Sequence, residues 1–179
     1  MFKGSVNGCD NVTSRRVYDG KIISVRVDNV WINGRQAVRE VVEHGGSAAI
    51  LPLIDDTIVM EKQYRYAIDR ELYEIPAGTL EDGENPEDCA RRELIEETGY
   101  EAGKLEALMR CYMTPGYCTE LIHFFVATDL KEVSHEMDPD EQLNVVEIKV
   151  DEAVKMILNG EIQDAKTICA VLTYLASKG

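Results

Sequence analysis

The sequence lacks any long run of apolar residues. A helix that spans a bilayer needs roughly 18 to 20 consecutive apolar residues, and no stretch of the 179 residues approaches that length. The first five residues also lack the apolar segment of a secretory signal peptide. We therefore expect neither a membrane span nor secretion.

Basic residues are in short supply as well. The chain has 19 Lys and Arg against 33 Asp and Glu, and its formal net charge is −14. Nucleic acid and anionic membranes require a surplus of positive charge that neutralises phosphates, so we expect neither as a partner. A small phosphorylated ligand stays compatible with this charge, because divalent cations can bridge protein carboxylates to phosphate oxygens.

Cysteine offers few options for structural chemistry. The five cysteines are odd in number and include no C-x-x-C pair, which is the spacing typical of zinc and redox sites. We interpret them as thiols in a reducing compartment and expect a cytoplasmic location.

What the sequence does contain is a regular alternation of strand and helix patterns. Residues 1–18 show little pattern, and we expect an arm there. Apolar residues on both sides of Asn33-Gly34 predict a hairpin over 20–43, because both turn residues tolerate positive φ. Further strands are expected at 47–54, 57–64, 72–75, 105–112, 121–128 and 145–150, and helices at 86–98, 151–158 and 164–176. Such interleaving around one core predicts an α/β or α+β fold.

The predicted helix at 86–98 carries an unusual concentration of carboxylates. Glu93, Glu96 and Glu97 are three and four residues apart and fall on one stripe of a helix. Like charges four apart destabilise a helix by a few tenths of a kcal/mol, but a divalent cation between them would make the crowding favourable. Taken alone, the three residues fit a solvated acidic face equally well.

The spacing around these glutamates decides between the two interpretations. From Gly78 onward the chain resembles the signature of the Nudix hydrolase family, Gly-x5-Glu-x7-Arg-Glu-(aliphatic)-x-Glu-Glu-x-Gly-(aliphatic). The matching residues are Gly78, Glu84, Arg92, Glu93, Leu94, Glu96, Glu97 and Gly99. Only the last position departs, with Tyr100 in place of an aliphatic residue. A chance match at such residue frequencies is expected on the order of once in 10⁷–10⁸ starting points, so we adopt the resemblance.

The resemblance implies a Nudix fold, in which a mixed β-sheet is sandwiched between helices, here with an N-terminal antiparallel hairpin region. It implies a magnesium enzyme, with Mn²⁺ as a possible substitute. Glu93 and Glu97 are then direct metal ligands, and Glu96 binds metal directly or through water. Arg92 is expected to hold these carboxylates, by pairing with Glu84.

Three flanking segments are similar to the ADP-ribose pyrophosphatase branch of the family. They are Gln63-Tyr64-Arg65, Glu74-Ile75-Pro76-Ala77-Gly78 and Thr114-Pro115-Gly116, in which the proline lies sixteen residues beyond Gly99. This similarity implies hydrolysis of the ADP-ribose pyrophosphate bond to AMP and ribose 5-phosphate by metal-activated water. It also implies the following roles: the backbone carbonyl of Ala77 as a metal ligand, Arg39 and Arg65 on the phosphates, Glu120 on the terminal ribose, and Glu141 as the general base or as the group that orients the attacking water.

Two alternatives stay open at this point. The same chemistry could act on another nucleotide sugar such as GDP-mannose, or the chain could be a Nudix module that senses nucleotide sugars without cleaving them. The resemblance also implies a homodimer, with residues 1–45 as an arm and hairpin for dimerisation and base binding and residues 46–179 as the hydrolase domain. Exposed Trp31 on the hairpin would suit that role, although Trp31 could equally belong to its own core.

Overall fold

The computed structural model describes residues 9–134 and 143–179. The chain divides into two compact units, one formed by residues 1–46 with 112–121 and the other by residues 47–111 with 122–179. Among the described residues, no helix has both the length and the apolar character needed to cross a membrane.

The first unit contains a three-stranded antiparallel sheet in the order β1-β2-β3, formed by Cys9–Asp19, Ser24–Ile32 and Arg35–Glu43. The predicted hairpin is confirmed, and its turn residues Asn33 and Gly34 have φ angles of 52° and 72°. The arm expected over residues 1–18 is wrong for the part that forms β1. Two register shifts interrupt the pairing of β1 with β2, and such bulges break the period-two pattern by which a strand is detected.

The second unit is built on a seven-stranded mixed sheet. The order β10-β5-β4-β9-β8 forms its main path, while β6 pairs with β5 and β7 with β4. The pairing of β4 with β9 is parallel. The strands are β4 Ser47–Ile54, β5 Thr57–Arg65, β6 Arg70–Glu74, β7 Ala77–Thr79, β8 Tyr100–Tyr112, β9 Leu121–Glu132 and β10 Leu143–Lys149.

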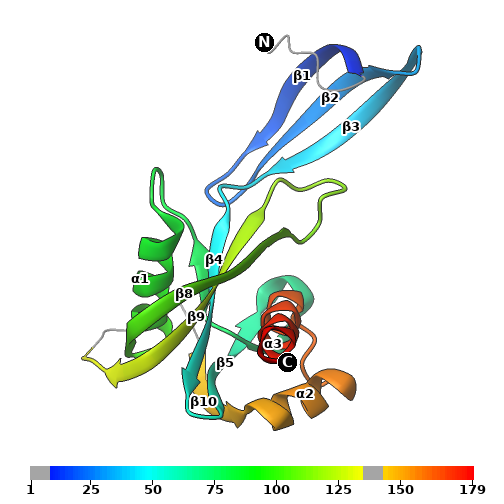
Figure 1. The fold of residues 1–179 in the computed structure, drawn as a ribbon. Coiled ribbons are helices and arrows are strands. Elements are labelled where there is room, and N and C mark those ends of the chain that lie inside the picture. The colour runs from blue at the N-terminus through cyan, green and yellow to red at the C-terminus, as the bar shows by residue number, and fades with distance from the viewer. Residues whose placement is uncertain (1–8, 135–142) are drawn as a thin grey trace. The chain divides into compact units, whose positions relative to one another are not determined.

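Three helices and one short 3-10 turn complete the second unit. They are α1 Pro86–Thr98, α2 Val150–Leu158, α3 Ala165–Lys178 and η1 Tyr66–Ile68. Helix α1 lies on one face of the large sheet and α3 on the other (Figure 1). The predicted class, a mixed sheet between helices, is confirmed.

Local chemistry defines both ends of α1. The Asn85 side chain accepts a hydrogen bond from the Glu87 N–H at 3.0 Å, and Pro86 occupies the first helical position. At the other end Gly99 has a φ of 75°, a left-handed conformation that favours glycine, and its N–H bonds to the Ile95 carbonyl.

A buried apolar cluster fixes α1 against the sheet. It joins Cys89, Ala90 and Leu94 of the helix to Ala48, Ile50, Ala102, Phe125 and Ala127 of the strands. The many alanines let the helix backbone approach the sheet closely. Full burial of a leucine side chain contributes about 1.5–3 kcal/mol to the free energy of folding. This packing holds the helix that carries the glutamates firmly against the sheet.

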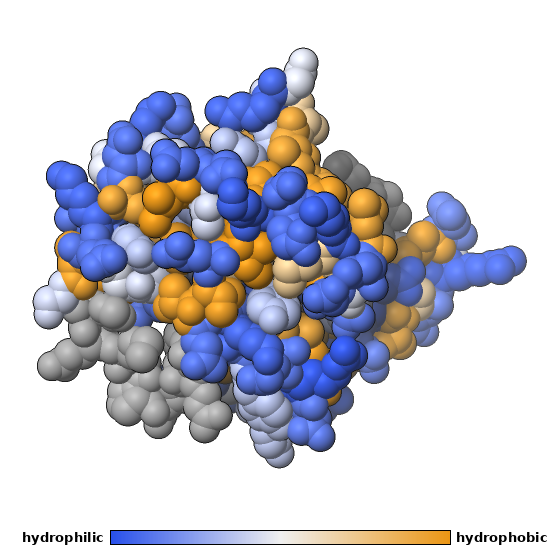
Figure 2. All heavy atoms as spheres, turned by 90° about the horizontal axis from the view of Figure 1, so that it is seen from below, coloured by the Kyte–Doolittle hydropathy of each residue, from blue (hydrophilic) through white to orange (hydrophobic). Residues whose placement is uncertain are grey.

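The surface reflects the composition of the chain. Figure 2 shows one face, on which patches of hydrophobic residues lie among hydrophilic ones.

Candidate functional site

Two glutamates of α1 reach the backbone of β7. The Glu97 side chain is buried, and its Oε2 accepts a hydrogen bond from the Ala77 N–H at 2.7 Å. Glu93 lies directly against Gly78, because a Cβ added to that glycine would stand 1.8 Å from Glu93 Oε1. Gly78 therefore has no room for a side chain as long as the Glu93 carboxylate keeps its position. The two carboxylates and two consecutive backbone units form one oxygen-rich wall.

Arg92 ties together the other carboxylates of the signature. Its guanidinium donates from Nε and Nη2 to the two oxygens of Glu84, each at 3.0 Å, so the predicted pairing is present. Nη1 also donates to Glu93 at 2.7 Å and to Glu96 at 3.0 Å. One arginine thus pairs with three carboxylates and offsets part of their mutual repulsion.

The Glu84 carboxylate is held firmly in its charged form. Hydrogen bonds from Arg92 and from the Glu81 backbone N–H lower the pKa of Glu84 to about 2. The same contacts, chiefly that with Glu84, raise the pKa of Arg92. This pair stays ionised at any pH near neutrality and anchors the loop before α1 to the helix.

The three glutamates of the predicted stripe do not have equal surroundings. Glu93 and Glu97 face β7, whereas the Glu96 side chain is 50% exposed. Within residues 9–134 and 143–179, no three His, Cys, Asp or Glu side chains converge closely enough to form a ready-made metal site. Arg92 forms ion pairs with Glu84, Glu93 and Glu96 and so neutralises part of their negative charge.

The donor set nevertheless fits magnesium. Mg²⁺ prefers oxygen ligands, binds through one or two protein carboxylates and keeps several waters. Glu93 and Glu97 supply carboxylates at one point of the sheet, beside the main chain of Ala77 and Gly78. No nitrogen or sulfur ligand is needed.

A second charged group is found where β5 ends. Arg65, at the end of β5, donates to both oxygens of Glu74 at 2.8 and 2.6 Å. The pKa of Arg65 is raised, mainly by these hydrogen bonds, with further attraction from Glu61 and Glu97.

Two predicted site residues belong to the first unit. The side chain of Arg39 on β3 is exposed and donates to the Val38 carbonyl at 2.9 Å. Glu120 follows the Thr114–Pro115–Gly116 turn and lies 3.9 Å from His44 Nδ1. That nitrogen accepts a hydrogen bond from the Gly46 N–H at 3.1 Å.

The Thr-Pro-Gly turn is docked within the same unit. Tyr117 and Cys118 donate to the Thr114 carbonyl, which closes the turn. The Val42 N–H then donates to Tyr117 O at 2.7 Å, and Val42 O accepts from Thr119 N at 3.0 Å. The predicted base Glu141 lies outside the described residues.

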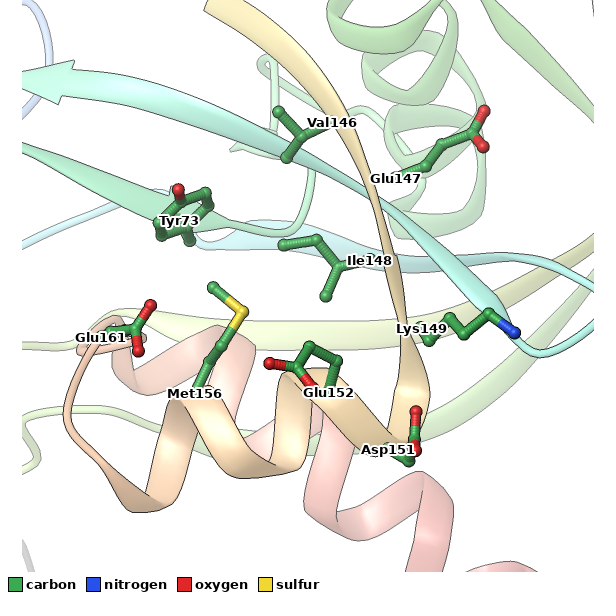
Figure 3. Close-up of a pocket in the computed structure, with 9 residues that line it drawn as sticks. All are labelled: Tyr73, Val146, Glu147, Ile148, Lys149, Asp151, Glu152, Met156 and Glu161. Carbon is green, nitrogen blue, oxygen red and sulfur yellow. The ribbon is translucent and has the colours of Figure 1, made fainter.

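A separate hollow in the second unit contains none of the predicted residues. It has a volume of about 580 Å³, and its lining includes Tyr73, Val146, Ile148, Met156, Glu152 and Glu161. Figure 3 shows Tyr73, Ile148 and Met156 pointing into this space, above α2. An open hollow without a signature residue is a weaker candidate for phosphate chemistry than the wall formed by β7 and α1.

Sequence reasoning missed two charged residues near the site. Glu74 lies in one of the segments that carry the resemblance but received no assigned role, and Lys166 was not singled out. The Lys166 ammonium is an ion-pair partner of Glu74. The sequence signal was slight: a glutamate just before Ile75-Pro76, and a lysine in the first turn of the last helix.

We predict that Gly78→Ala impairs the expected phosphoanhydride hydrolysis without unfolding the chain. The new methyl group would displace the flexible end of Glu93 rather than backbone. A shift of a reacting group by about 1 Å can lower the rate on the order of a hundredfold. Steady-state kinetics and the thermal unfolding midpoint measure the two effects. Thr79→Ala, which changes the next and exposed residue of β7, is the control. Full activity of Gly78→Ala would contradict the proposed placement of Glu93.

Known proteins share sequence similarity with this chain. The NUDIX domain family model matches residues 43–171. An ADP-ribose pyrophosphatase of Bacillus subtilis (strain 168) is 41% identical over 171 residues, which cover 93% of this chain and 92% of the relative. A protein of Bacillus methanolicus named methanol dehydrogenase activator is 39% identical, with 89% of each chain covered.

Other relatives carry a different substrate name. A GDP-mannose pyrophosphatase of Citrobacter koseri is 41% identical over 150 residues, which cover 78% of each chain. A crystal structure described as an ADP compounds hydrolase superposes with a TM-score of 0.84 over 98% of both chains at 23% identity, which supports the fold. On the family match, the relatives and the complete signature between Gly78 and Gly99, the chain belongs to the Nudix hydrolase family.

Proposed function

We propose that this hydrolase cleaves the pyrophosphate bond of ADP-ribose and releases AMP and ribose 5-phosphate. One observation carries the proposal: Glu93 and Glu97 converge on the Ala77–Gly78 backbone. This arrangement can bind a charged diphosphate in spite of the acidic surface. The named ADP-ribose pyrophosphatase, similar over nearly the whole chain, supports the choice of substrate.

A divalent metal is part of the proposal, with Mg²⁺ as the ion and Mn²⁺ as a substitute. Glu93, Glu97 and the carbonyl of Ala77 would hold it, and exposed Glu96 would bind it directly or through water. When bound, such an ion lowers the pKa of a water ligand and neutralises phosphate charge. Arg92 would keep Glu93 and Glu96 in place while substrate binds and leaves.

The side chains of Arg65 and Arg39 are proposed to contact the two phosphates. Arg65, fixed by Glu74, would face phosphate charge that develops as the bond breaks. Arg39 and Glu120 are proposed to contact the second phosphate and the terminal ribose, as the sequence similarity implies. Glu141 remains the proton acceptor proposed from the sequence.

A substrate panel tests the proposal. We expect the purified chain with Mg²⁺ to cleave ADP-ribose with a higher kcat/KM than GDP-mannose, NADH or a nucleoside triphosphate, and to form AMP and ribose 5-phosphate. EDTA should abolish the reaction. Much faster cleavage of GDP-mannose would show the ADP-ribose assignment to be wrong and would favour the other substrate named among the relatives. Binding of nucleotide sugars without any turnover would favour the sensing module.

Glu97→Gln tests the catalytic role of the buried carboxylate. The amide oxygen of glutamine can still accept from the Ala77 N–H, so folding should persist, but the negative charge is lost. We expect kcat to fall on the order of a hundredfold. Glu87→Gln on the same helix is the control, because its pairing with Arg91 is exposed at the surface. Near-normal turnover by Glu97→Gln would count heavily against the proposed site.

A homodimer is the proposed assembly, and the β1-β2-β3 sheet supplies a surface for it. Tyr18, Trp31 and Val38 are exposed. In β2, Tyr18 is paired with Val25 and Val38 with Asn29. These two positions and Trp31 are separated by even numbers of residues, so Tyr18, Trp31 and Val38 share one face of the sheet. The opposite face carries Arg26, which is paired with Asp28 and Glu43. We propose residues 1–45 as the dimerisation and base-binding region and residues 46–179 as the hydrolase domain.

Sedimentation equilibrium tests the dimer. We expect the wild-type chain to be a dimer at micromolar concentration and the double variant Trp31→Glu, Val38→Glu to be a monomer, because two buried charges would destabilise an apolar interface. Ile22→Glu, which alters an exposed apolar residue outside the strands of the same unit, is the control. A fully active wild-type monomer would overturn the assembly.

The compartment is also a proposal. Cys89, Cys111, Cys118 and Cys169 are thiols rather than disulfides. Burial first of all raises the pKa of Cys89 to about 12, so this thiol is a packing group and not a nucleophile. The free thiols support a reducing, cytoplasmic location.

A further inference from the structure

A buried ion-pair network joins Arg65 to the start of α3. The guanidinium contacts Glu74 at two points, from Nε to Oε1 at 2.8 Å and from Nη2 to Oε2 at 2.6 Å. The Glu74 side chain is 1% exposed, whereas the Arg65 side chain is 39% exposed. A two-point contact fixes the plane of a guanidinium. Glu74 therefore orients Arg65, while part of the Arg65 side chain stays exposed to solvent.

Lys166 approaches Glu74 from another element. Its ammonium donates to Oε2, the same oxygen that Arg65 Nη2 contacts. Lys166 also lies 3.1 Å from Asp164, whose carboxylate caps α3 through the Thr167 N–H and hydroxyl. The Thr167 hydroxyl in turn accepts from the Ile75 N–H at 2.9 Å. The start of α3 is thus tied to the chain just before β7.

Lys166 offsets part of the negative charge that acts on Arg65, to which Glu61 and Glu97 also contribute. A buried carboxylate paired with a single arginine would cancel the charge of that arginine. Here Lys166, only 12% exposed, supplies a second cation to Glu74. The negative charge of Asp164 is offset in part by the positive end of α3. Glu74 stays ionised, since its pKa is lowered by both cations against the effect of burial.

We propose that Glu74 and Lys166 are positioning residues for the phosphate contact of Arg65. Glu74 sets the orientation of the guanidinium, and Lys166 balances Glu74 so that the exposed edge of Arg65 keeps its positive potential. The inference rests on the proposed function in one respect, because it requires a diphosphate at Arg65. It adds that the last helix contributes to the site through a contact between residues 92 positions apart.

A purely structural role is the competing explanation. The same network could serve only to fasten α3 to the sheet, and loss of Lys166 would then lower stability and leave ligand affinity unchanged. Affinity for a phosphate ligand, measured in the presence and absence of Arg65, separates the two explanations.

The experiment measures the affinity of the full chain for inorganic pyrophosphate with Mg²⁺ by calorimetry, alongside KM and kcat for ADP-ribose. The variants are Lys166→Met, Glu74→Gln and Lys166→Arg. Lys62→Met is the matched control, because Lys62 pairs with exposed Glu71 at 2.7 Å and its substitution removes the same charge from the same unit. Thermal unfolding of each variant establishes that it is folded. If Lys166→Met is not folded, Glu74→Gln provides the test in its place.

We expect Lys166→Met and Glu74→Gln to weaken pyrophosphate binding and to raise KM by roughly tenfold or more, as losses of supporting contacts commonly do. Lys166→Arg should restore much of the affinity, and Lys62→Met should leave it unchanged. In an Arg65→Ala background, Lys166→Met should have no further effect, because the two residues act as one unit.

Three results would overturn the inference. The first is unchanged affinity for pyrophosphate in both Lys166→Met and Glu74→Gln. The second is a loss of affinity with Lys166→Met that is equal in the presence and absence of Arg65. The third is unchanged affinity for pyrophosphate in Arg65→Ala alone. Failure of the proposed function would look different. Wild-type chain that binds pyrophosphate through this network but cleaves a substrate other than ADP-ribose contradicts the substrate assignment and leaves the network intact.

Discussion

The central constraint on this molecule is the mutual repulsion of the carboxylates that surround the start and the inner flank of α1. Arg92 offsets it by pairing with Glu84, Glu93 and Glu96 together. The remaining carboxylate, Glu97, is buried and satisfied by the backbone of β7. Acidic groups can therefore gather at one point without unfolding the helix, and they stay available as oxygen ligands for a cation.

The rest of the second unit maintains that arrangement. Apolar packing on Ala48 and Ile50 fixes the height of α1 above the sheet. The short strand β7 pairs with β4, so the backbone that faces the glutamates belongs to the same rigid layer. On the other side, α3 is linked to the chain before β7 by the contact between Thr167 and Ile75. Helices on both faces of one sheet thus contact the chain between Ile75 and Gly78.

Sequence reasoning succeeded where chemistry is local. Asn85 and Gly99 bound the helix because a cap and a left-handed glycine act within a few residues, and Asn33-Gly34 specifies its turn in the same way. It failed for β1, whose pairing is interrupted by register shifts, and for β7, which is three residues long and depends on β4. The pairing of Glu74 with Lys166 was also beyond reach, since no spacing rule connects residues so far apart in the chain.

The account depends on divalent cations binding at the carboxylates of α1, and a calorimetric titration of the purified chain with Mn²⁺ tests this most directly. We predict saturable uptake by the wild-type chain and loss of that uptake in the double variant Glu93→Gln, Glu97→Gln. Competition by Mg²⁺ should reduce the signal, because both ions use the same oxygen ligands. No uptake by the wild-type chain, or equal uptake by the double variant, would contradict the account.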